Sequence, residues 1–286
     1  MGLDVALYGF LEVGGAPVPV VTIGALGFSG LMSAVSYFQG ASLVLSSLHA
    51  EPLDPIDDEH RQLHNIVTEM ALAAGVPKPQ VFVIRDPSPN ALATGRDPTH
   101  AAIAVTQGAL DLLDREETQG VVAHEMGHIA NRDTLTMTVV GVLLGGIALL
   151  SDWSRRAMYF SRGDGKRRGL ALLPLVLLLL ILSPILSRLL AMAISRRREY
   201  QADATAAQLT RNPLGLARAL EKIGAANASP LRAASRGTAH LFISDPLRRA
   251  SDEREGRLAD LLSTHPPLHL RIAILRAMAH SGSAVG

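Results

Sequence analysis

The stretch Val121–Asp133, VVAHEMGHIANRD, is the most informative part of this chain. Apolar residues surround two histidines, His124 and His128, which are four positions apart. Residues four apart share one face of a helix, so both imidazoles can bind the same metal ion. Glu125 lies about 100° around the helix from His124, where it can act as a general base toward water. The alternative, a pair of solvated helix histidines, is disfavoured by the apolar surroundings.

Two histidines leave a metal site short of ligands, and a third is expected. Glu199 and Asp203 are also four apart, in the sequence REYQAD. We predict that Glu199 is the third ligand and that Asp203 accepts the N–H of a ligand imidazole. The chain has no cysteine, so the ligands must be histidine and carboxylate. The prediction is one Zn²⁺ per chain. Non-haem iron uses a similar ligand set, but the adjacent Glu125 favours hydrolytic zinc chemistry.

Hydrophobic residues make up 48% and charged residues 19% of the 286 residues, and the net charge is +1. This composition excludes a long disordered chain, and the charge gives no support to nucleic-acid binding. The chain contains three uncharged stretches that are long enough for membrane helices, and each lies between two charged residues. These pairs are Glu12 and Glu51, Asp133 and Asp152, and Arg168 and Arg188. Buried core helices are the alternative explanation for the last two stretches.

The uncharged stretches predict how the chain meets a lipid bilayer. One membrane span is predicted at about Val18–Leu45, with a kinked hairpin as the alternative. Two hydrophobic segments, 134–151 and 169–187, are predicted to form a membrane hairpin around a basic loop, either spanning or re-entrant. Arg196, Arg197 and Arg198 follow the last segment, which places the flanking polar parts on the cytoplasmic side. The predicted divisions are a tail (1–17), a transmembrane segment (18–48), a first half-domain (49–133), the hairpin (134–195) and a second half-domain (196–286).

Periodicity and capping signals predict a mainly helical α+β domain with a small sheet. The predicted strands are Val81–Ile84 and Ala101–Val105, separated by a loop that runs through Arg96. Helix starts are predicted from a capping box at Asp114 and Glu117, from Thr106, and from Asn212–Pro213. The predicted helices are 57–75, one after Thr106, one from Arg115 past Ala130, 197–210, 213–223, and one opened by Pro266–Pro267 that ends near Met278.

Four blocks together resemble the HtpX family of membrane zinc metalloproteases. The blocks are Asn90–Gly95 (NALATG), Val121–Asp133, Arg198–Asp203 and Ser263–Pro267 (STHPP). The resemblance implies a zincin-like fold integrated with transmembrane helices, in the bacterial cytoplasmic (inner) membrane as a multi-pass protein. It implies a stress-response protease for misfolded or damaged membrane proteins, with the lipid bilayer and unfolded protein as its partners.

The resemblance also suggests roles for residues outside the zinc helix. His265 is the candidate donor to the oxyanion that forms during peptide hydrolysis, and a helix-capping position without a catalytic role is its alternative. Asn90 and Ala91 are candidates for holding substrate as a strand added to a sheet edge, with a plain turn as the alternative. A site-specific CAAX-type processing protease is the competing function, and an inactive membrane scaffold is a further one.

Overall fold

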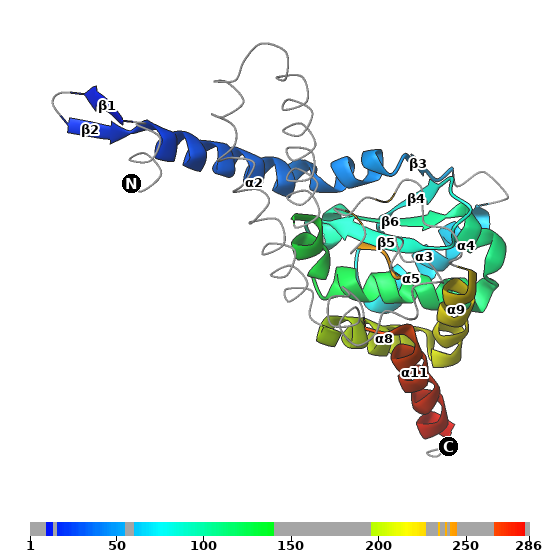
Figure 1. Cartoon of the computed structure of the whole chain (residues 1–286). Coiled ribbons are helices and arrows are strands. Elements are labelled where there is room, and N and C mark those ends of the chain that lie inside the picture. The colour runs from blue at the N-terminus through cyan, green and yellow to red at the C-terminus, as the bar shows by residue number, and fades with distance from the viewer. Residues whose placement is uncertain are drawn as a thin grey trace, which may run out of the picture.

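The computed structural model of this chain is a small sheet with helices packed on both of its faces (Figure 1). The structure describes residues 10–13, 16–54, 60–139, 196–226, 234, 238, 241–244 and 266–283. The predicted hydrophobic segment 169–187 and His265 lie outside these ranges, as does most of segment 134–151. The predicted domain boundaries stay predictions.

The sheet has four strands in the order β3 (Ala50–Pro52), β4 (Gln80–Ile84), β6 (Ala101–Thr106) and β5 (Ala91–Gly95). The central pair, β4 and β6, is parallel, whereas β3 and β5 pair antiparallel with their neighbours. The connection from β5 to β6 contains a short 3₁₀ helix, Pro98–His100. This topology leaves β5 as an edge strand of the sheet.

The side chains of β6 alternate between two apolar layers, as expected for a strand covered on both faces. Ile103 and Val105 belong to the larger layer, which the helices beneath the sheet complete. Ala102 and Ala104 belong to the smaller layer on the opposite face, together with Val44 and other residues from the end of α2. The predicted strands at Val81–Ile84 and Ala101–Val105 are therefore confirmed as the central pair of the sheet, of which β6 is fully buried.

Helix α5 (Arg115–Ala130) lies in the centre of the fold and carries the two histidines. It begins with the predicted capping box, in which Asp114 and Glu117 each accept a backbone N–H of the other at 2.9 Å. Every residue from Gly120 to Ile129 is buried. A helix buried around its whole circumference is a core helix, so its polar residues need partners inside the protein.

Three helices pack against α5 in the part of the chain that the structure describes: α3 (Arg61–Ala74), α8 (Arg196–Thr210) and α9 (Pro213–Ala226). Helix α11 (Leu268–Ser283) packs on α8 and α9, and α4 (Gln107–Leu112) packs on β6. The predicted signals define their ends: Gly75 closes α3 with a left-handed φ of 67°, and Asn212 accepts the N–H of Gly215 at the start of α9. Helix α11 continues to Ser283, past its predicted end near Met278.

Helix α2 (Val20–Ser47) corresponds to the predicted membrane span and runs outward from the sheet (Figure 1). Within the described residues, no helix meets the combined length and hydropathy expected of a membrane span. The predicted integration of the fold with transmembrane helices therefore stays unconfirmed.

Two segments differ from the secondary structure predicted for them. The predicted tail 1–17 contains strand β1 (Phe10–Val13), which pairs with β2 (Ala16–Pro19). The predicted loop before Arg96 was wrong over Ala91–Gly95, which forms strand β5. Its sequence, ALATG, has Thr94 as its single β-branched residue and no aromatic residue, and pairing with β6 outweighs that weak local preference.

Candidate metal centre

Helices α5 and α8 approach closely beside the two histidines. A methyl group built on Gly127 would lie 3.3 Å from the Cα of Ala202, so small residues on both helices permit this distance. The buried residues of α8 are Glu199, Ala202, Asp203 and Ala206, which form a single stripe at helical spacing. The same stripe that packs α8 against α5 therefore carries both predicted carboxylates into the protein interior.

The structure brings together the three residues predicted as metal ligands. Glu199 Oε2 lies 3.8 Å from His124 Nε2, and Glu199 Oε1 lies 3.4 Å from His128 Nε2. One ligand atom from each residue lies within 4.8 Å of the others, and all three residues are buried. Two imidazole nitrogens and one carboxylate oxygen are a common set of protein ligands for a catalytic zinc ion. The donor set and its burial therefore fit a divalent cation.

Glu125 is 2% exposed and lies next to this group of ligands. Burial raises the pKa of Glu125 to about 7. The positive charge of His128 opposes this rise, and the negative charge of Glu199 adds to it. A carboxyl group with a pKa close to neutral can both accept and release a proton at physiological pH. This is the behaviour expected of a residue that acts first as a base and then as an acid.

The two imidazoles differ in their preferred protonation state. Burial and the charge of Arg271 lower the pKa of His124 to about 4, so its ring is neutral and able to bind a metal. Burial disfavours the charged form of His128, but Asp133 and Glu199 outweigh burial and raise its pKa to about 10. A metal cation bound between these side chains would balance the same negative charges that the proton on His128 balances.

Asp203 takes the position predicted for it, with its Oδ1 2.9 Å from His124 Nδ1. Its carboxylate also accepts two hydrogen bonds from Arg271, at 2.9 Å from Nε and 2.7 Å from Nη2. Burial opposes the charge on Asp203, but Arg271 outweighs burial and lowers the pKa of this carboxyl to about 2. Asp203 is therefore an anion in the folded protein at neutral pH.

Arg271 is a member of the site that the sequence analysis missed. It lies on α11, is 0% exposed, and also lies 3.5 Å from Glu199 Oε2 through Nη1. A signal for it was present in the sequence. Arg271 shares a helix face with the apolar residues Leu268, Ile272 and Leu275, all of which contact the core. An arginine on the apolar face of a predicted helix indicates a buried acidic partner.

Replacing Arg271 with methionine should lower the free energy of unfolding of the metal-free protein by about 3–5 kcal/mol, because Asp203 would stay buried without its cation. Urea unfolding followed by circular dichroism measures this loss. Arg276→Met is the matched control on the same helix, since Arg276 is 58% exposed and pairs with Glu221 at the surface. The control should lose less than about 1 kcal/mol. Equal losses for the two variants would contradict the buried ion pair.

The two residues predicted to bind substrate contact a segment of the chain itself. Asn90 is fully buried, and its side-chain amide donates to the carbonyl oxygen of Ser244 at 2.9 Å. The carbonyl oxygen of Ala91 accepts the N–H of Ile243, also at 2.9 Å. Segment 241–244 therefore lies against the first half of edge strand β5. A substrate strand could pair with Asn90 and Ala91 only after this segment moves away, and their substrate-binding role stays a prediction.

Two histidines of α5 are buried together with Glu199 of α8, and Glu125 lies beside the histidines on α5. This is the arrangement of a metal-dependent peptidase. The chain belongs to Peptidase family M48, whose family model matches residues 57–279. The prediction that this protein is a metalloprotease is thereby confirmed, and two relatives confirm the resemblance to the HtpX family.

Two relatives illustrate the family membership. The Protease HtpX homolog of Caldanaerobacter subterraneus subsp. tengcongensis is 48% identical over 257 residues, covering 88% of this chain and 82% of that protein. The Protease HtpX homolog of Pyrococcus abyssi is 43% identical over 249 residues, covering 87% of this chain and 83% of that protein.

A crystal structure of S. mikatae Ste24p shares the fold. It aligns with a TM-score of 0.53 at 20% sequence identity, over 87% of this chain and 57% of that chain. This similarity bears on the fold alone, and it agrees with the mainly helical α+β architecture described above.

Proposed function

We propose that this protein is a zinc-dependent membrane endopeptidase that cleaves misfolded or damaged membrane proteins. The observation that carries the proposal is the buried group formed by His124, His128 and Glu199, with Glu125 beside it. In this group, His124, His128 and Glu199 would hold the zinc ion.

A zinc ion supplies Lewis acidity, which activates water and polarises a peptide carbonyl group. The carboxylate of Glu125 takes a proton from the attacking water and then gives that proton to the nitrogen of the leaving amine. Asp203 holds Nδ1 of His124, so that Nε2 of the same ring stays directed at Glu199. His265, as an oxyanion donor, and Asn90 and Ala91, as substrate-binding residues, complete the proposed machinery.

The membrane setting is supported by the sequence pattern and by α2. Leu31 and Phe38 are each 62% exposed on this helix, and large apolar side chains gathered on one surface mark a contact with lipid or protein. The candidate ligands come from both sides of residues 140–195, which contain the long uncharged run between Arg168 and Arg188. If that run enters the membrane, both ligand helices meet the bilayer on the same side, which we propose is the cytoplasmic one.

Removal of the metal tests the proposal directly. The purified full-length chain should contain close to one zinc ion per chain and should cleave unfolded casein. Cleavage should fall to background after a chelator removes the metal, and it should return when zinc is added back. Metal content is measured by atomic emission and cleavage by release of labelled peptides. Full cleavage by a sample that contains no metal would overturn the proposal.

A further inference from the structure

The two histidines of the candidate metal centre are held in the same way. His124 presents Nδ1 to Asp203 at 2.9 Å, and Asp203 is held in turn by Arg271. His128 presents Nδ1 to Asp133 Oδ2 at 3.3 Å. Each ring therefore directs Nε2 toward Glu199 and has a carboxylate behind it. The first carboxylate was anticipated from its spacing to Glu199, whereas Asp133 was not.

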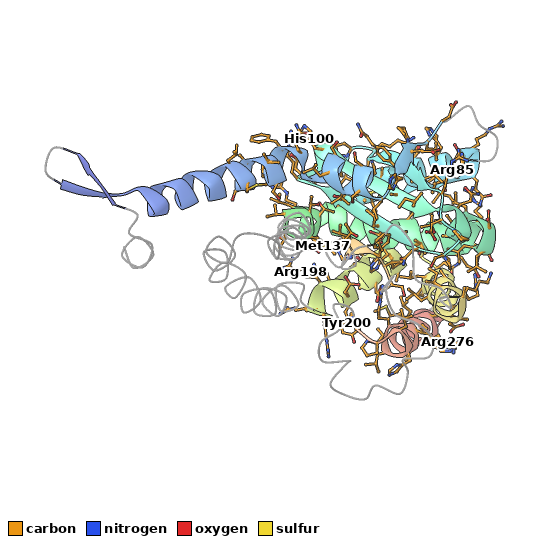
Figure 2. The ribbon with its side chains drawn as sticks, turned by 45° about the horizontal axis from the view of Figure 1, so that its top comes forward. Arg85, His100, Met137, Arg198, Tyr200 and Arg276 are labelled. Atoms are coloured by element: carbon orange, nitrogen blue, oxygen red, sulfur yellow. The ribbon has the colours of Figure 1, made fainter. Side chains whose placement is uncertain are left out.

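Asp133 is also held by an arginine. Nη1 of Arg198, at the start of α8, lies 3.5 Å from Oδ1 of Asp133. Figure 2 labels Arg198 on α8 and Met137 on the segment that Asp133 begins. Asp133 is 9% exposed, so water screens its charge only weakly. The arrangement behind His128 is thus a weaker and more exposed counterpart of the one behind His124.

The backbone after α5 turns Asp133 back toward the site. The helix ends at Ala130, and Arg132 follows with a φ of 60°. This left-handed conformation is uncommon for a residue with a side chain and costs about 1 kcal/mol or more. The turn places the carboxylate of Asp133 beside the ring of His128, five residues earlier in the chain. The surrounding structure therefore maintains a strained turn at the position that forms this contact.

We propose that Asp133 is a positioning residue that fixes the tautomer and orientation of His128 for metal binding, and that Arg198 holds Asp133 in place. A carboxylate at Nδ1 keeps the proton on that nitrogen, which leaves Nε2 with the lone pair that binds the metal. The proposal rests on the proposed function, because it assigns Asp133 to the same metal centre.

The competing explanation is purely structural, because Asp133 also begins a helical segment, residues 133–139. Asparagine keeps the size of aspartate and a hydrogen-bonding oxygen, but it brings no negative charge to the imidazole. Asp133→Asn therefore separates the two roles. It should leave the far-ultraviolet circular dichroism spectrum of the metal-free protein unchanged and weaken zinc binding about 10-fold, whereas Asp133→Ala should weaken binding by about 10–100-fold.

Zinc affinity of the full-length chain is measured by competition with a chromogenic chelator. Asp111→Asn is the matched control, because Asp111 is an exposed helix carboxylate that pairs with Gln107. It should bind zinc as the wild type does. Wild-type affinity in Asp133→Asn, with a loss only in Asp133→Ala, would overturn the positioning role and leave the proposed function standing. A wild-type chain that binds no zinc would overturn the proposed function itself.

The link to Arg198 has its own test. Arg198→Ala should weaken zinc binding by about twofold to fivefold, since its side chain is 32% exposed and partly screened. The same change made in the Asp133→Ala protein should have no further effect, because the partner is already absent. Arg197→Ala, which removes an exposed charge from the neighbouring position, is the control and should bind normally. Additive losses in the double variant would refute the role of Arg198.

Discussion

Changing Glu125 to glutamine is expected to abolish peptide cleavage while zinc stays bound. Glutamine has nearly the same shape, so the buried packing around position 125 is retained, but it cannot take a proton from water. General acid–base catalysis contributes about 10²–10⁴-fold to rates, and a loss of this size should appear in the turnover number. Labelled casein cleavage and metal analysis of the same sample measure both quantities.

Glu116→Gln is the matched control for this change. Glu116 lies on the same helix, but its side chain is 61% exposed and pairs with Arg218 at the surface. The control should cleave casein at the rate of the wild type. If Glu125→Gln also retained that rate, Glu125 could not be the base, although the metal centre could still be correct.

Replacing Glu199 with alanine should remove zinc from the purified protein. The change removes a carboxylate that lies near both Nε2 atoms. The loss of affinity should exceed the roughly 10–100-fold that follows removal of an outer hydrogen-bond partner. Activity should fall with the metal content, in contrast to the Glu125 variant, which keeps its zinc.

A folding defect must be separated from the loss of a ligand in this experiment. Glu199→Gln preserves the shape of the side chain and should also lose zinc, because a neutral amide is a poor replacement for a carboxylate ligand. Glu221→Ala, which removes a half-exposed surface glutamate paired with Arg276, should keep its full zinc content. Unchanged zinc stoichiometry in both Glu199 variants would refute the ligand assignment.

Local sequence signals predicted the helices and the central strands, because their causes lie within a few residues. The capping box of Asp114 and Glu117 and the glycine stop at Gly75 occur where the sequence places them. The same holds for the spacing of His124 and His128, which places both rings on one face of a single helix. Short-range geometry is enough for such features.

The features that were missed depend on contacts between distant segments. Arg271 reaches Asp203 across 68 positions of sequence and His124 across 147. Its place on an apolar helix face indicates that it is buried, but no local pattern identifies which residue it pairs with. Strand β5 has a weak strand sequence and forms because β6 pairs with it. The position of segment 241–244 against β5 is likewise a consequence of tertiary packing, through the fully buried side chain of Phe242.

The assembly of the metal centre from α5, α8 and α11 has a consequence for biosynthesis. During translation, the two histidines leave the ribosome long before Glu199, and Arg271 follows later still. A nascent chain that ends before α11 cannot neutralise the buried carboxylate of Asp203, so its centre is incomplete. On the proposed function, the complete centre therefore forms only after this last helix has docked.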